Sequence, residues 1–274
     1  MKFKILTANI AFGRTKMNNL FLNVTTHFIF HGRQMITIFT NPKALKMRPG
    51  YLHSRRVNYL KKYSNLKNVL TLIDEEKADV VMLNELIFQL HRDQLENALL
   101  GMGYKYFSWG MSEHYDDTKV SSFVASKIPG KAEIIEFPQE SHAGGGGGIA
   151  VTRFSELKVT AVAVHMCVSD KFPWLYKAEV EAIAKFILEE RFSGREVIIC
   201  GDFNASSSFI KKYSAFSKLN LKNADNDMPT CPTFFPIMKP LDHIFIPQHW
   251  NILNAKTIAF DSDHLAVSVI AELD

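Results

Sequence analysis

The chain has few cysteines and lacks any long apolar run. Its three cysteines, Cys167, Cys200 and Cys231, are widely spaced in the 274 residues and form no CxxC motif. This spacing excludes a disulfide framework and a thiolate zinc site, and it favours a reducing compartment. The roughly 18 consecutive apolar residues of a membrane-spanning helix are missing, and the apolar start is too short and interrupted for a signal peptide. We therefore expect a cytoplasmic protein.

Acidic residues are missing from the first quarter of the chain. Residues 1–73 contain 13 Lys or Arg and no Asp or Glu, whereas the remainder contains 19 basic and 28 acidic residues. A basic segment of this kind attracts polyanions such as nucleic acid or an anionic lipid surface. It equally suits a positive edge that balances an acidic remainder within one fold, so the charge pattern alone identifies no partner.

Motifs of two common enzyme classes are also missing. The chain has no GxSxG sequence, which argues against a hydrolase with a serine nucleophile on a strand-to-helix turn. The five glycines at 144–148 are not followed by the Lys-Ser/Thr that completes a phosphate-binding loop, nor by a helix pattern. We expect this run to form a flexible turn or lid.

What is present is a strand-rich pattern with a few helices. Expected strands are 2–10, 77–86, 104–109, 119–127, 158–166, 196–204, 240–246 and 265–273, and expected helices are 54–76, 92–103 and 176–194. Since no repeat or linker interrupts them, we expect one domain over 1–274, with an excursion at 13–50 that contains a hairpin turning at His31-Gly32. Two packed sheets covered by helices and a doubly wound parallel sheet both fit this α/β pattern.

Polar residues close the apolar strands. They are Asn9, Glu85, His165, Asp202 with Asn204, Asp242 with His243, and Asp263 with His264. Each one alone has a simple structural explanation, for example an Asx-turn at Asp202 and Asn204 or a capping role for Asp263. Together they are harder to explain, because six strands would each have to place a carboxylate, amide or imidazole at the same end by chance. The strand ends of one sheet layer lie along a common rim. We therefore expect these side chains to converge.

The chemical types in this set favour metal-assisted phosphoester hydrolysis. Glu85, Asp263 and Asn9 offer hard oxygen donors, which suit Mg²⁺, or Mn²⁺, better than zinc. A site with two carboxylates, an amide and waters leaves positions open for a phosphate oxygen. Histidines beside carboxylates suit proton transfer or charge stabilisation near neutral pH.

Six short motifs resemble the endonuclease/exonuclease/phosphatase superfamily. "TANI", "DVVMLNE", "AVAVHM", "GDFN", "LDHIFI" and "SDHLAV" occur in the family's order from residue 3 to about residue 270, interrupted by the excursion. The superfamily includes deoxyribonuclease-like nucleases, apurinic-site endonucleases, neutral sphingomyelinases and inositol polyphosphate phosphatases. The resemblance implies a four-layer α/β sandwich of two packed mixed β-sheets flanked by helices, with the site at one end of the sheets.

The resemblance also implies a role for each motif residue. Glu85 looks like the main metal carboxylate, assisted by Asn9 and Asp263. Asp202 looks like the residue that orients or deprotonates the attacking water, and Asn204 like one that holds this water or the phosphate. His165 and His264 look like the pair that binds the scissile phosphate, with Asp242 orienting His264. The matched catalytic residues are thus His165, Asp202, Asn204, Asp242 and His264.

Three positions vary within the family pattern. Asn84 stands where a glutamine usually precedes the metal glutamate, which we expect to alter hydrogen bonding around the site more than the reaction. His165 resembles the deoxyribonuclease and sphingomyelinase branches rather than the apurinic-site branch. His243 stands where tyrosine is common, and we interpret it as a packing or surface residue.

The substrate is left open by the sequence. The basic front carries Arg14, Arg55 and Arg56 among aromatic residues, a pattern that fits DNA or RNA, because cations follow a phosphate backbone and rings stack on bases. A hairpin in segment 20–40, tipped by residues 28–30, equally suits peripheral membrane contact, or its aromatics simply pack on the sandwich. We expect a monomeric phosphodiesterase or nuclease first, a phosphatase or phospholipase C-type enzyme second, and a non-catalytic binding protein a distant third.

Overall fold

The computed structural model describes residues 1–10, 66–110, 120–135, 149–169, 173–234 and 237–273. The expectations for the excursion at 13–50, the hairpin, Arg14, Arg55, Arg56 and the five-glycine run fall outside these described residues and stay predictions. Among the described residues, no helix is long and apolar enough to cross a membrane.

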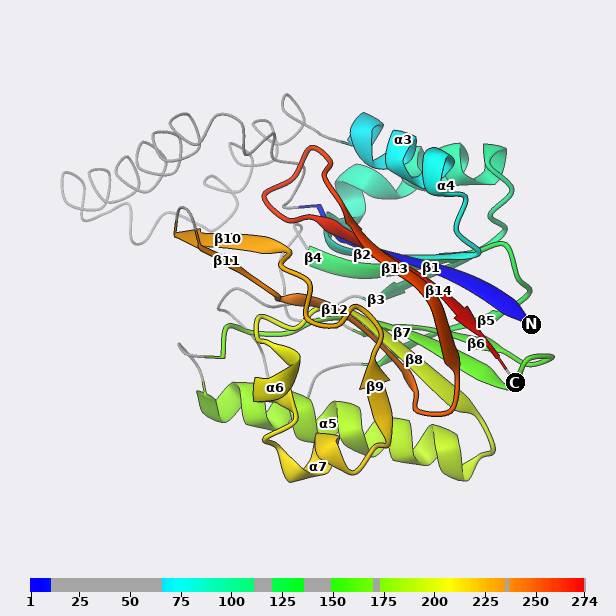
Figure 1. Cartoon of the computed structure of the whole chain (residues 1–274). Helices are drawn as coiled ribbons and strands as arrows, with labels where there is room; N and C mark the ends of the chain where they lie inside the picture. Colours follow the sequence, from blue (N-terminus) through cyan, green and yellow to red (C-terminus); the bar gives the residue numbers. More distant parts are fainter. Residues whose placement is uncertain (11–65, 111–119, 136–148, 170–172, 235–236, 274) are drawn as a thin grey trace, which may run out of the picture.

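Two six-stranded mixed sheets form the centre of the molecule (Figure 1). The first sheet has the order β13 (Asn251–Ile258), β14 (Ala266–Glu272), β1 (Lys2–Asn9), β2 (Val80–Ile87), β4 (Val120–Ser126), β3 (Tyr106–Gly110). The second has the order β5 (Lys131–Ile135), β6 (Ile149–Phe154), β7 (Val159–His165), β8 (Glu196–Asp202), β12 (Asp242–Pro247), β9 (Leu221–Asn223). A separate two-stranded sheet pairs β10 (Cys231–Phe234) with β11 (Ile237–Lys239).

Helices cover the outer face of each large sheet. The first sheet is covered by α3 (Leu66–Glu76) and α4 (Phe88–Gly101), and the second by α5 (Pro173–Phe192) with the short α6 (Ser207–Ile210) and α7 (Ser214–Ser217) (Figure 1). The order helix, sheet, sheet, helix confirms the four-layer sandwich and excludes the doubly wound parallel sheet.

The alternation of side chains along buried strands produces these layers. In β1, Ile5 packs into the core between the sheets, while the next residue, Leu6, packs under α3 and α4. In β8, Ile198 faces the other sheet and Val197 faces α5. Because both faces of these strands are buried, their sequences are almost continuously apolar, as expected for the central strands of a covered sheet.

Strand directions bring the polar residues to one rim. β1 runs parallel to β2 in one sheet, and β7 runs parallel to β8 in the other. The hydrogen bond between Asn9 and Asp202 shows that both pairs end at the same side. β12 is antiparallel to β8, with Asp242 paired to Asp202, and β14 is antiparallel to β1. The prediction that Asp242 and His264 close strands is therefore wrong: Asp242 begins β12 and His264 precedes β14, and both reach the same rim because these strands run the opposite way.

Candidate active site

Glu85 is directed into the site by an irregularity in β2. The register of β2 against β4 shifts between Leu83 and Leu86, which is the position of a β-bulge. Glu85 has φ 59°, a left-handed conformation that costs a non-glycine residue about 1–3 kcal/mol. This strained backbone lets Asn84 and Glu85 both serve the site from one strand.

Asn84 connects the two sheets beneath the site. Its Nδ2 donates to Ser122 Oγ at 3.1 Å and to the Val164 carbonyl at 2.8 Å, and its Oδ1 accepts from the Asp202 amide at 3.2 Å. Completely buried, Asn84 fixes the spacing between the strands that carry Glu85 and Asp202. Sequence reasoning identified only its unusual type, not this connecting role.

The glycine of "GDFN" is required by the close approach of β7. Gly201 has φ 136°, and a Cβ placed there would lie 1.9 Å from the Val164 carbonyl oxygen and 2.7 Å from Asn84 Oδ1. Only glycine satisfies both the backbone conformation and the contact. The next residue, Asp202, thereby points from the end of β8 into the rim.

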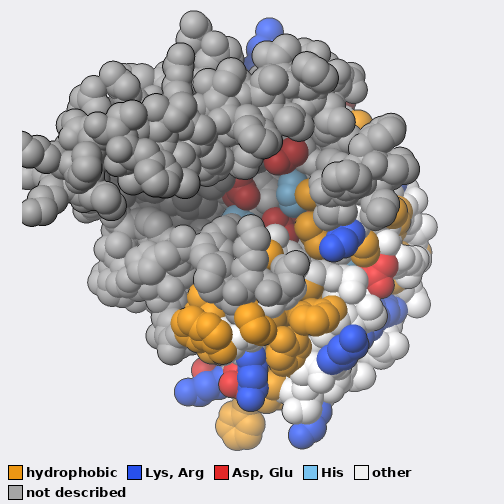
Figure 2. All heavy atoms as spheres, turned by 90° about the vertical axis from the view of Figure 1, so that its left-hand side faces the viewer, with side chains coloured by type: hydrophobic (Ala, Val, Ile, Leu, Met, Phe, Trp, Pro, Cys, Tyr) orange, Lys and Arg blue, Asp and Glu red, His pale blue; other side chains and the backbone are white. Residues whose placement is uncertain are grey.

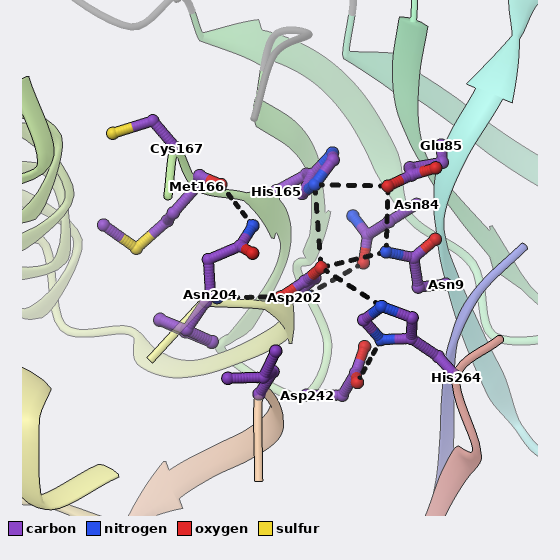
Figure 3. Close-up of polar contacts among 12 residues, drawn as sticks. Asn9, Asn84, Glu85, His165, Met166, Cys167, Asp202, Asn204, Asp242 and His264 are labelled. Carbon is purple, nitrogen blue, oxygen red and sulfur yellow. Dashed lines mark hydrogen bonds and ion pairs between the residues drawn. The ribbon is translucent and has the colours of Figure 1, made fainter. Parts of the chain in front are cut away.

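Asp202 is the centre of the side-chain cluster in Figure 3. Its Oδ2 lies 2.9 Å from Asn9 Nδ2, 3.6 Å from His165 Nε2 and 4.0 Å from His264 Nε2. Glu85 joins through Oε1, which is 3.2 Å from Asn9 Nδ2 and 3.6 Å from His165 Nε2. Five strands or strand-flanking segments thus contribute to one cluster, and Figure 2 shows acidic and histidine side chains gathered on this face.

Asn9 orients both central carboxylates. Its amide nitrogen donates to Glu85 and to Asp202, so a single side chain at the end of β1 holds the two carboxylates together. The ligand role expected for its oxygen stays a prediction.

The Glu85 carboxyl lies where its negative charge is poorly compensated. Burial raises its pKa to about 8, and the nearby charges of Asp263 and Asp202 add to the rise, while His264 and the hydrogen bond from Asn9 oppose it. Asp263 is exposed, and its negative charge disfavours ionisation of Glu85. A carboxylate pair of this kind gains from a bound cation.

His165 is buried without a hydrogen bond at either ring nitrogen among the described residues. Burial lowers its pKa, although the Asp202 carboxylate acts in the opposite direction. A buried polar atom without a partner is costly, and such atoms mark positions where a ligand or water completes the hydrogen bonding. Its Nε2 faces the space between Glu85 and Asp202.

His264 is held by Asp242 as a protonated imidazole. Its Nδ1 donates to Asp242 Oδ2 at 2.7 Å. Burial acts to lower the His264 pKa, but Asp242, a hydrogen bond with the Cys231 thiol and the charge of Asp202 raise it well above its usual range. The Asp242–His264 contact predicted from the sequence is therefore present.

Cys231 places a thiol beside the site that the sequence did not indicate. It lies on β10 beside His264. Burial raises the pKa of its thiol, so it remains protonated and is a weak ligand. Sequence reasoning missed Cys231 because no spacing signal relates it to residues of other strands.

Asn204 lies beyond the end of β8 and does not share a strand face with Asp202. Its φ is 48°, its amide donates to Asp202 Oδ1 at 2.7 Å, and its Nδ2 donates to the Met166 carbonyl at 2.8 Å. The Asx-turn considered from the sequence is thus present, and it leaves the side-chain amide of Asn204 bonded to the Met166 carbonyl. Figure 3 shows Asn204 beside Asp202, with its amide turned to Met166.

The donor set fits a hard divalent cation. Glu85, Asp263 and Asn9 supply carboxyl and amide groups, the raised pKa of Glu85 reports uncompensated negative charge, and the neighbouring thiol is protonated. Ligand atoms of Glu85, His165 and Asp202 all lie within 4.8 Å of one another, a spacing that one ion can bridge. Carboxylates and imidazoles that could hold a cation with open positions fit metal-assisted hydrolysis, including that of phosphoesters.

Comparison with known proteins agrees with this class. The sequence profile of the endonuclease/exonuclease/phosphatase family matches residues 6–264, so the chain belongs to that family of divalent-metal-dependent phosphoesterases. It therefore acts on phosphate esters. No curated protein sequence matches the chain significantly.

Several solved structures share the fold. Danio rerio TDP2 complexed with single-strand DNA product is 15% identical, with a TM-score of 0.63 and 99% of each chain covered. ANGEL2, described as a 2′,3′-cyclic phosphatase, is 13% identical, with a TM-score of 0.65 over 99% of this chain and 95% of that one. A family protein from Leptotrichia buccalis is 15% identical, with a TM-score of 0.65 over 99% and 100%.

Proposed function

We propose that the chain is a Mg²⁺-dependent phosphodiesterase of the nuclease type, in which an activated water attacks phosphorus. The observation that carries the proposal is a buried cluster in which the ionised form of Glu85 lacks a compensating positive charge and the two imidazoles favour different protonation states. His264 is biased to the protonated form and His165 to the neutral form. A cation and a phosphate together would satisfy all these groups.

Glu85, Asp263 and Asn9 would hold the metal. When bound, Mg²⁺ offsets negative charge on the phosphoryl oxygens. Among the described residues, the oxygen donors of this end of the sandwich match the preference of Mg²⁺ better than that of a softer metal, and Mn²⁺ would substitute.

The two histidines would bind the scissile phosphate. Nδ1 of His264 donates to Asp242, and the raised pKa of His264 favours the imidazolium form, in which Nε2 also carries a proton and can donate to a phosphoryl oxygen as charge develops. Both ring nitrogens of His165 are buried and have no hydrogen-bond partner among the described residues. Nε2 can therefore donate a hydrogen bond to a bound phosphate. Asp242 would hold His264 in the donating orientation.

Asp202 would orient and deprotonate the attacking water. Burial and the charge of Asp242 raise its pKa, and His264 and His165 oppose that rise, so the carboxylate is more basic than a solvent-exposed one. Asn9 and the Asn204 amide fix its two oxygens. Asn204 would act mainly through this hydrogen bond, with its own side chain reaching the water or phosphate only after leaving Met166.

The basic front of the chain supports a polyanionic substrate such as DNA or RNA. Electrostatic attraction between Lys or Arg and a phosphate backbone falls steeply as salt increases. Hydrolysis of DNA, RNA and anionic lipid vesicles should therefore be compared at two salt concentrations. A salt-sensitive preference for nucleic acid supports a nuclease, and a preference for vesicles supports the phospholipase C-type alternative.

The catalytic proposal is tested with bis-p-nitrophenyl phosphate. Glu85→Gln and His264→Ala should each lower kcat by roughly 100-fold or more, since each removes charge stabilisation in the transition state. The matched control is Glu181→Gln, on an exposed carboxylate of α5, which should leave the rate unchanged. Hydrolysis that survives a chelator, or near wild-type turnover in both site variants at saturating Mg²⁺, contradicts the assignment.

A further inference from the structure

His243 has a structural role that its sequence position did not suggest. It is completely buried next to Asp242 on β12, so of the two interpretations given for it, packing is confirmed and a surface position is wrong. Successive residues of a strand point to opposite faces. Asp242 accordingly contacts His264, while His243 points away from the site and contacts the segment that follows Asp202.

Both ring nitrogens of His243 have acceptors. Nε2 donates to the Ala205 carbonyl at 2.9 Å, and Nδ1 faces Asp225 Oδ1 at 3.2 Å. A carbonyl oxygen can only accept, so Nε2 carries a proton, while Nδ1 lies between the Asp225 carboxylate and the Asn223 amide nitrogen, 3.4 Å away. Burial acts to lower the pKa of His243, but Asp225, Ala205 and the charge of Asp227 raise it above its usual range.

The carboxylates of Asp225 and Asp227 already accept hydrogen bonds within the protein, so they do not form a site that is open to a ligand. Asp225 accepts from the Asp227 amide and the Ile244 amide, both at 2.9 Å. Asp227 accepts from the Ser207 amide at 3.0 Å and from Ser207 Oγ at 2.6 Å. Although Asp225, Asp227 and His243 have metal-like spacing, their atoms are already used in hydrogen bonds, in contrast to His165 in the catalytic cluster.

In the segment after Asp202, three consecutive backbone carbonyls each accept a hydrogen bond from a side chain. The Phe203 carbonyl accepts from Tyr176 Oη at 2.9 Å, the Asn204 carbonyl from Ser169 Oγ at 3.3 Å, and the Ala205 carbonyl from His243. Asn204 lies in the middle of this segment in a left-handed conformation, φ 48°. Such a conformation persists only where surrounding contacts hold it.

We propose that His243 is a positioning residue that holds the Asn204 turn, and with it the Asp202 carboxylate, in register with His264. The adjacent residues Asp242 and His243 would fix the two sides of the phosphate site from a single strand, one through His264 and the other through the Ala205 carbonyl. This inference rests on the proposed phosphoesterase function for its catalytic consequence, but the positioning itself is measurable without substrate.

Two conservative variants separate the hydrogen bonds of His243. His243→Gln places an amide nitrogen near the position of Nε2 and keeps a donor for Ala205, whereas His243→Asn places its amide near Nδ1 and loses that donor. We expect kcat on bis-p-nitrophenyl phosphate to fall roughly 10- to 100-fold in H243N with KM nearly unchanged, because small displacements of catalytic groups cost about this much. H243Q should stay within about three-fold of wild type by the same reasoning.

The control for general destabilisation is Ile246→Val. Ile246 lies on the same strand but packs between the sheets, away from the Asn204 turn. It should lower thermal stability without a fall in kcat. A kcat loss in I246V equal to that in H243N would mean that any weakening of β12 affects the rate, and would overturn the positioning role.

Amide hydrogen exchange tests the inference independently of activity. The Asn204 amide, bonded to Asp202, and the Ser207 amide, bonded to Asp227, should exchange at least about tenfold faster in H243N than in wild type or H243Q. If the wild type hydrolyses no phosphoester, the proposed function fails, and this exchange pattern alone decides the positioning role. Unchanged protection in H243N, or equal loss in H243N and H243Q, overturns the inference.

Discussion

Binding of the divalent metal should depend strongly on pH, because Glu85 must lose a proton to become a ligand. Its pKa is raised to about 8 in the metal-free protein, chiefly by burial and then by Asp263. The ionised fraction is then about one half at pH 8 and about 1% at pH 6, so the apparent Kd for Mg²⁺ should be roughly 50-fold weaker at pH 6.

Isothermal titration calorimetry measures this dependence directly. Titrations in two buffers with different ionisation enthalpies should show the release of about one proton per metal below pH 7. Glu85→Gln should abolish both the tight binding and its pH dependence, while the exposed control Glu181→Gln should change neither. A wild-type Kd that is constant from pH 6 to pH 8, with no proton release, would refute this reasoning.

The same shift determines how pH affects stability. The folded-state pKa of Glu85 lies above the unfolded value of 4.5, so the folded protein binds the extra proton between these values. Its stabilising contribution is present below pH 4.5 and is lost as pH rises towards 8. The increase in Tm on adding saturating Mg²⁺ should consequently be larger at pH 8 than at pH 6.

Three further substitutions test separate parts of the structure. Asp242→Asn should lower kcat/KM roughly 10- to 100-fold and move the alkaline limb of its pH profile to lower pH, because His264 loses the carboxylate that raises its pKa. Gly201→Ala should lower the free energy of unfolding by more than ~3 kcal/mol in urea denaturation, whereas Gly194→Ala, with no atom within 4 Å of the added Cβ, should cost only about 1 kcal/mol. Burial raises the pKa of Glu179 to about 7, so Glu179→Gln should reduce the loss of stability that urea denaturation measures between pH 5 and pH 8.

The central strands were predictable because both of their faces are buried. β1, β2, β7 and β8 have nearly continuous apolar sequences, and their observed bounds differ from the predicted ones by only a few residues. In contrast, the exposed edge strand β13 was not predicted, because few of its side chains are buried and no clear alternation results. The short β9, β10 and β11 were also missed, because a segment of three or four residues is too short to show an alternation.

The residues that form the site could be predicted from the sequence, but their arrangement could not. Short motifs identified Glu85, Asp202 and His264, and the structure brings these side chains together. The bulge at Glu85 and the left-handed turn at Asn204 were not predictable, because both depend on contacts with other strands. The roles of Asn84 and His243 were missed for the same reason: each depends on hydrogen bonds to residues distant in sequence.

Anomalous diffraction from crystals soaked with Mn²⁺ and phosphate tests the central claim most directly, since that claim is a single shared site for a cation and a phosphate. We predict one dominant Mn²⁺ peak at roughly 2.0–2.3 Å from a Glu85 carboxylate oxygen. The phosphate should lie within hydrogen-bond distance of His165 and His264. A peak remote from Glu85, or phosphate bound away from both histidines, would contradict the account.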